Sequence, residues 1–183
     1  MFVAILTALV TVIAPSAAPR IATAPTDATA VRLQGLNDPT IVAIYDAANT
    51  YDIEASHLAE RKATTKEIRD FAAMLVMAHT DARQKGRDLA KKLGVTPTPP
   101  KQNPLAPDHV AAMKRLNSLS GKAFDRAFLE NEIAYHKAVI AAVTTTLLPA
   151  IQNAELKQLV VSVSPVFVQH QKAAESLLAK MPA

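Results

Sequence analysis

Apolar residues recur at intervals of three and four through most of the chain after residue 37, which is the spacing of one face of an α-helix. Residues typical of helix starts and stops bound four long segments with this pattern, 38–62, 65–94, 120–148 and 153–180. A shorter helix is predicted over 108–119. Glycine occurs only four times, and most of the twelve prolines lie between the segments. The pattern predicts an all-α protein.

The lengths of the links predict how these helices are connected. Short links after Lys62 and after Leu148 favour two antiparallel helical hairpins. The proline-rich stretch from Gly94 to Pro107 lies between the hairpins and is long enough, at about 3.3 Å per residue, to run the length of a helix. The short helix after it either continues this crossover or folds back. We therefore expect a ferritin-like four-helix bundle with an additional short helix in the crossover between long helices two and three.

The first 37 residues lack the helical pattern. Residues 1–14 form an uncharged apolar run followed by small residues and proline, which is typical of a secretory signal, although no Lys or Arg precedes the run. The run is too short to span a bilayer as an ordinary helix. We expect a signal peptide over 1–24, a flexible tether over 25–37 and a single bundle domain over 38–181, in a protein exported to the periplasm or envelope. A buried N-terminal helix and a retained membrane anchor are the alternatives.

Composition narrows the classes of function. Cysteine is absent, which excludes disulfides, thiolate metal sites and cysteine nucleophiles. The net charge is only +4, basic residues are dispersed among acidic ones, and Trp is absent, so nucleic acid is not an expected partner. No stable transmembrane span is expected in the mature chain, and nothing in the sequence identifies a protein partner.

Each long helix carries one ionisable side chain among the apolar positions of its buried stripe. These side chains are Asp52, His79, His136 and His170, and Glu132 lies one turn before His136. Each lies near or somewhat past the middle of its helix, so all are expected to meet in one layer of the bundle. Burying such groups is costly unless they are paired or coordinated.

Two interpretations of this polar layer are open. Three imidazoles and one or two carboxylates suit a single transition-metal ion, Zn, Fe, Cu or Ni. A hydrogen-bonded His/Asp network that sets the register of the helices accounts for the same residues. Other polar residues are expected outside the layer: Asp81 in solvent, His109 at the surface, and the Glu54/His57 pair, spaced E-x-x-H, facing mostly outward.

Three segments and two histidines carry a family resemblance. The segments are DPTIVAIYDAANTYDIEASHLA, IRDFAAMLVMAHTDARQKGRDLAKKLGV and LSGKAFDRAFL, and a single His lies late in each of the last two long helices. From Asp38 to about Lys180 the chain resembles a bacterial ferritin-like family of unknown function (DUF4142), whose members are often labelled predicted outer membrane proteins.

The resemblance implies an exported helical bundle, with Asp52, His79, His136 and His170 as shared polar positions, and it implies no activity. The chain departs from the family pattern at three positions. Ala78 and Tyr135 stand where an acidic residue commonly precedes the His, and Asp52 stands where Glu is usual.

Ferroxidase chemistry is not expected. Ferritins carry E-x-x-H in two helices, whereas Val76 and Phe167 stand here at the Glu positions before His79 and His170.

These observations support one leading hypothesis and one alternative. The leading hypothesis is a non-enzymatic bundle of the envelope or periplasm with a structural, stress-related or binding role. The alternative is a protein that binds a single transition metal, or a metal-dependent redox or hydrolytic enzyme, that uses the His layer.

Overall fold

Helices form the regular structure of residues 36–101, 103 and 105–182, which are the residues that the computed structural model describes. The long helices are α2 (Asp38–Lys62), α3 (Lys66–Leu93), α5 (Gly121–Ala142) and α7 (Ala154–Ala179), and the short ones are α4 (Ala106–Ser118) and α6 (Leu148–Ala150). No strand occurs within these described ranges, so the all-α prediction is confirmed. The predicted signal peptide and all but the last two residues of the predicted tether lie outside them.

Side-chain caps begin α3 and α7 at the predicted residues, whereas α2 is capped by Asn37 and not by Asp38, and Ser120 makes no side-chain cap bond at the start of α5. The Asn37 side chain accepts a hydrogen bond from the backbone N–H of Thr40 at the start of α2 (2.9 Å). Thr65 and Asn153 do the same for α3 and α7. Gly94 ends α3 in the left-handed conformation, with a φ of 64°, which glycine adopts without strain.

The end of the third long helix was predicted too early. It was expected to stop before Pro149, but α5 continues through a π-helical turn, Val143–Leu147, into α6 and ends at Ala150. Pro149 lies in the first turn of α6, where its missing N–H costs little. Pro165 lies inside α7, and the helix continues through it without a break.

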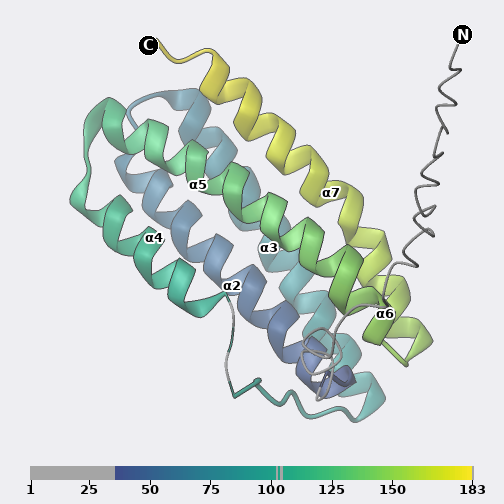
Figure 1. Ribbon diagram of the computed structural model, residues 1–183. Helices are drawn as coiled ribbons and strands as arrows, with labels where there is room; N and C mark the ends of the chain where they lie inside the picture. Colours follow the sequence, from purple (N-terminus) through teal and green to yellow (C-terminus); the bar gives the residue numbers. More distant parts are fainter. Residues whose placement is uncertain (1–35, 102, 104, 183) are drawn as a thin grey trace, which may run out of the picture.

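The four long helices form a four-sided bundle (Figure 1). α2 packs along α3 and α5 packs along α7, and contacts between α3 and α7 and between α2 and α5 close the square. The chain after α3 runs back beside α2 and continues in the same direction as α4, so the short helix belongs to the crossover and does not fold back (Figure 1). The term ferritin-like stays a prediction.

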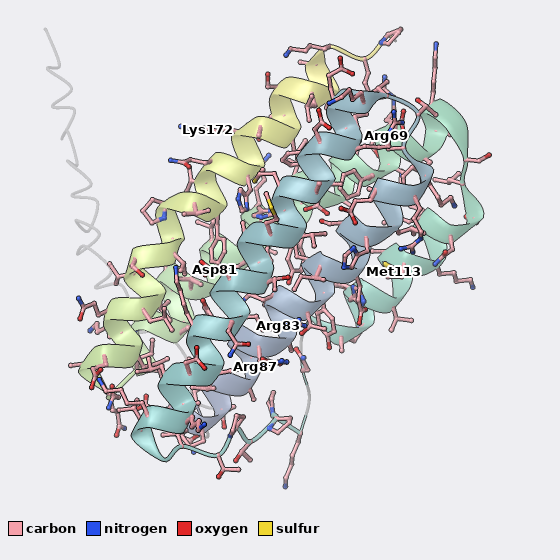
Figure 2. The ribbon with its side chains drawn as sticks, turned by 180° about the vertical axis from the view of Figure 1, so that it is seen from behind. Arg69, Asp81, Arg83, Arg87, Met113 and Lys172 are labelled. Carbon is pink, nitrogen blue, oxygen red and sulfur yellow. The ribbon has the colours of Figure 1, made fainter. Side chains whose placement is uncertain are left out.

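Two apolar clusters fill the bundle, one toward each end. The first contains Phe71, Leu75, Phe124 and Phe128, and the second contains Ile41, Tyr45, Leu147, Leu156 and Val160. Charged side chains such as Asp81, Arg87 and Lys172 lie on the outside (Figure 2). The buried polar layer therefore lies between two apolar blocks that hold the four helices in register.

One stretch of the described residues, Gly121–Ala150, has the length and composition of a membrane-spanning helix. Its mean hydropathy reaches only 1.2. Phe124, Phe128, Glu132 and His136 are buried on one of its faces, and 22% of its most apolar window is buried in the bundle. One weakly apolar helix among the described residues is consistent with the expectation of no stable transmembrane span.

Candidate metal centre

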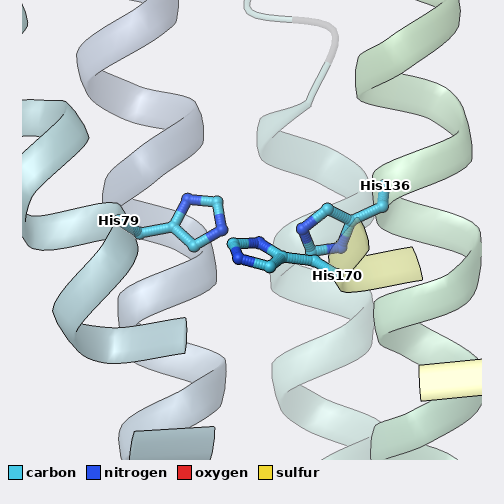
Figure 3. Close-up of side chains that lie close together, drawn as sticks. All are labelled: His79, His136 and His170. Carbon is cyan, nitrogen blue, oxygen red and sulfur yellow. The ribbon is translucent and has the colours of Figure 1, made fainter. Parts of the chain in front are cut away.

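Side chains from four helices meet inside the bundle. His79 comes from α3, His136 from α5 and His170 from α7 (Figure 3), and Asp52 comes from α2. These four residues are 1–4% exposed. The ring centroids of the three histidines form a nearly equilateral triangle with sides of 5.2, 5.3 and 5.6 Å.

The potential metal-ligand atoms form two overlapping groups, His79 with His136 and His170, and Asp52 with Glu132 and His136. Asp52 Oδ2 lies 3.4 Å from His79 Nε2 and 3.7 Å from His136 Nε2. Ligands held about 2.0–2.1 Å from one tetrahedral ion lie roughly 3.3 Å from each other. One donor atom from each of the three imidazoles lies within 4.8 Å of the other two.

The outer nitrogens of two rings have partners that fix their tautomers. Asn49 Nδ2 donates to the backbone oxygen of Tyr45 (2.8 Å), so Asn49 Oδ1 faces His79 Nδ1 at 2.9 Å. His79 must then carry its hydrogen on Nδ1. His136 Nδ1 likewise donates to the backbone oxygen of Glu132 at 2.9 Å. In neutral rings, the Nε2 atoms of both histidines therefore present lone pairs to the centre of the bundle.

The inward-facing atoms have no partner among the described residues. Five buried polar atoms, one from each side chain of the predicted layer, lack a hydrogen bond: Asp52 Oδ2, His79 Nε2, Glu132 Oε2, His136 Nε2 and His170 Nδ1. An unsatisfied buried polar group costs about 1–3 kcal/mol. Five such groups cost an amount comparable with the whole stability of a typical domain, about 5–15 kcal/mol. A cation or ordered water placed among these atoms supplies the partners that the described residues do not.

Burial keeps the histidines neutral. It lowers the pKa of His79, His136 and His170 to about 4 in each case. The charge of Asp52 raises the pKa of His136, but this effect is smaller than the lowering by burial. The three imidazoles are thus in the form that binds metal at neutral pH.

The two carboxylates influence each other. Burial raises the pKa of Asp52, and burial together with the charge of Asp52 raises the pKa of Glu132 well above its usual range. Ser56 Oγ donates to Asp52 Oδ1 (3.2 Å), which leaves Oδ2 directed toward the histidines. Glu132, Asp52 and His136 also offer donor atoms that lie within 4.8 Å of one another, so Glu132 borders the cluster on the α5 side.

Three neighbours of the layer were not singled out in the sequence as its partners. Asn49 and Ser56 orient His79 and Asp52 and are fully buried, and the Phe167 ring stacks on His79 with centroids 5.7 Å apart. Asn49 lies three residues before Asp52, a spacing that places both on one face of α2. That spacing is the signal in the sequence that could have identified it.

The other polar residues lie outside the layer. Asp81 is exposed, as expected. Glu54 and His57 do not bind each other, because His57 pairs with Glu60 and Glu54 pairs with His109. His109, expected at the surface, is half-buried: its side chain is 12% exposed and stacks on Tyr51 with ring centroids 4.3 Å apart.

Comparison with known proteins identifies the family. Residues 22–177 match the family described as Domain of unknown function (DUF4142). The chain belongs to this family. Among curated proteins no sequence matches.

The DUF4142 chain also has a similar solved structure. The crystal structure of a DUF305 fragment from Deinococcus radiodurans has a TM-score of 0.68 at 15% sequence identity, covering 79% of this chain and 96% of the fragment. At that identity the similarity extends to the fold alone.

Proposed function

We propose that this DUF4142 protein binds one divalent first-row transition-metal ion through His79, His136, His170 and Asp52. The ion supplies the positive charge and the shared partner that the inward-facing nitrogen and oxygen atoms lack. Four protein ligands complete a tetrahedral shell, which suits a binding or structural role. Of the metals expected from the sequence, Zn, Fe, Cu and Ni all accept imidazole nitrogen.

The observation that carries the proposal is the convergence of five buried polar atoms that make no hydrogen bond with the described residues. His79 and His136 each use their one N–H outward, and Asp52 Oδ2 offers only lone pairs when ionised. The donors left for a hydrogen-bonded network are the N–H of His170 and the proton that burial favours on Glu132, and the three lone-pair atoms outnumber them. A cation satisfies all of these lone-pair atoms together, and its charge favours the ionised form of the buried carboxylate.

Elemental analysis of protein purified without chelator tests the proposal. We expect one equivalent of metal per chain, or one equivalent taken up when the chelator-treated protein is titrated with Zn²⁺, Fe²⁺, Cu²⁺ or Ni²⁺. His136→Ala removes a ligand and abolishes stoichiometric binding. The matched control is His57→Ala, because His57 is an exposed imidazole that pairs with Glu60 and does not belong to the buried layer.

Two results contradict the proposal. One is the absence of stoichiometric binding with all four metals in the wild-type protein. The other is equal binding in the wild-type protein and His136→Ala, which places the metal on other groups.

We also propose that the protein is exported to the periplasm or envelope. The apolar run over residues 1–14 and the small residues after it support this proposal. Cell fractionation combined with N-terminal sequencing of the mature protein tests it. We expect a shortened chain outside the cytoplasm, and a full-length chain in the cytoplasmic fraction contradicts export.

A further inference from the structure

A cavity of about 200 Å³ opens beside the carboxylate side of the layer, between α2, α4 and α5. Asp52 and Glu132 form part of its wall, and Asp108 in the first turn of α4 lies at the exposed side. The three histidines do not line it. A solute in the cavity therefore meets the two carboxylates before it reaches the imidazoles.

The chemistry of the cavity wall favours a cation. Its acidic residues are Asp52, Asp108 and Glu132, and no Lys or Arg is among the described residues that line it. Glu132 is 0% exposed, and its Oε2 has no hydrogen-bond partner among the described residues. Burial favours the protonated form of Glu132, so a cation that binds this carboxyl group in the cavity displaces its proton to solvent.

Helix α4 covers the cavity and is attached mainly by polar contacts, to α5 through Arg115 and Glu130 and to α2 at two places. Leu116 is the one buried residue of α4. The helix is attached to α2 near its start, where His109 Nε2 lies 2.7 Å from Glu54 Oε2, and near its end, where Lys62 Nζ donates to the backbone oxygen of Leu116 (3.0 Å). An element with so little buried surface opens more readily than the long helices.

We propose that this cavity is the route by which the divalent cation reaches the centre, passing Asp108, then Glu132 and Asp52, before the histidines bind it. Glu132 is a transient ligand on this route. The inference rests on the proposed metal site and specifies how that site is filled and emptied. It separates the residues that set the rate of binding from those that set affinity.

Filling the cavity tests the route. Ala112 on α4 lines it, whereas the neighbouring Ala111 is exposed and does not. Stopped-flow mixing of metal-free protein with Zn²⁺ and a chromophoric chelator gives the loading rate, and transfer back to excess chelator gives the release rate. We expect Ala112→Phe to slow both by about tenfold and to leave the dissociation constant unchanged. Ala111→Phe is expected to behave as the wild type.

The charge at the mouth provides a second test. Asp108→Asn is expected to slow loading about twofold to threefold at low ionic strength, and added salt is expected to remove the difference. Asp88→Asn is the matched control, because Asp88 is an exposed carboxylate on α3 that does not line the cavity.

The outcomes separate this inference from the proposed function. A wild-type protein that takes up no metal contradicts both. A protein that binds one equivalent, with Ala112→Phe loading as fast as the wild type, overturns the route alone. If Ala112→Phe does not fold, His109→Ala replaces it: loss of the contacts with Glu54 and Tyr51 loosens the cover, so faster loading supports the route and an unchanged rate overturns it.

Discussion

At the scale of single residues, the direction of each ring nitrogen decides what the cluster can bind. Asn49 receives the Nδ1 hydrogen of His79 and is itself held by the backbone of Tyr45. This places the lone pair of His79 Nε2 3.4 Å from Asp52 Oδ2. Residues that orient a ligand in this way commonly matter almost as much as the ligand itself.

Asn49→Ala is predicted to weaken metal binding by about 10–100-fold, because His79 loses the partner that fixes its tautomer and orientation. Competition titration against a chelator of known affinity measures the change. Asn117→Ala is the matched control, since Asn117 also donates to a backbone oxygen four residues earlier but is exposed and has no histidine partner. Equal metal affinities of the two variants contradict a role of Asn49 in orienting His79.

The acid stability of the metal-free protein is predicted to depend on the three histidines. Their pKa values are lowered to about 4 in the folded state, whereas an unfolded histidine titrates near 6.5. Above about pH 6.5 both states are neutral; as the pH falls toward 4 only the unfolded state takes up protons, so the free energy of unfolding decreases. The raised pKa values of Asp52 and Glu132 act in the opposite direction.

Comparison with a variant isolates the contribution of one histidine. Urea denaturation without metal measures the free energy of unfolding of wild type and His170→Leu at about pH 7 and 4.5. Between these pH values the wild type is expected to lose more of this free energy than the variant, by on the order of 2 kcal/mol. Parallel losses in the two proteins contradict the assignment of a buried neutral imidazole at position 170.

At the scale of elements, a close contact between α2 and α3 lies beside the polar layer and determines the position of Asn49. The Tyr45 ring lies against Gly86, and a Cβ added there would approach Tyr45 Cε1 to 2.7 Å. Tyr45 OH donates to the backbone oxygen of Ala82 (3.0 Å), and the backbone oxygen of Tyr45 holds Asn49. The glycine thus permits the helix spacing on which the orientation of His79 depends.

Gly86→Ala is predicted to destabilise the bundle. Alanine improves helix propensity by about 1 kcal/mol, but overpacking against a well-packed ring costs about 1–3 kcal/mol. Urea denaturation measures the net change. In a Tyr45→Leu background the same substitution is expected to be neutral or stabilising, and a destabilisation of equal size in both backgrounds contradicts the steric explanation.

The sequence predicted the parts of the fold that depend on local pattern. Helical spacing placed Asp52, His79, His136 and His170 on buried stripes, and capping residues such as Asn153 marked helix starts. The environment of His109 was missed, because its partner Glu54 lies 55 residues away and no local pattern reports such a contact. The π-helical turn after α5 was also missed, and its Val143 and Leu147 are buried in the second apolar cluster.

The candidate site was predictable in its members but not in its details. Periodicity assigned one ionisable residue to each long helix, and position along the helices brought these residues to one level. Which nitrogen faces inward depends on Asn49 and on the backbone of Glu132. The cavity depends on how α4 packs against α2 and α5, and that packing is not encoded in any one segment.

At the scale of the whole molecule, the proposed metal site takes one side chain from each of the four long helices. The two apolar clusters pack the ends of the bundle, and the buried polar layer lies between them. The proposal therefore predicts that metal binding is coupled to folding.

Metal is predicted to raise the melting temperature by an amount set by its concentration. At a free-metal concentration of 100 times the dissociation constant, the added stability is about 2.7 kcal/mol. For a domain of this size that corresponds to roughly 5–11 °C. Differential scanning calorimetry with and without metal measures the shift, and His136→Ala is expected to show none. A shift of the same size in that variant would show that stabilisation arises elsewhere.

Anomalous X-ray scattering from crystals grown with one equivalent of metal locates the ion. We expect one strong peak inside the bundle, within coordination distance of Asp52 Oδ2, His79 Nε2, His136 Nε2 and His170 Nδ1. A peak confined to surface groups such as His57, or a polar layer that keeps its arrangement with no peak between the rings, contradicts the proposed metal site.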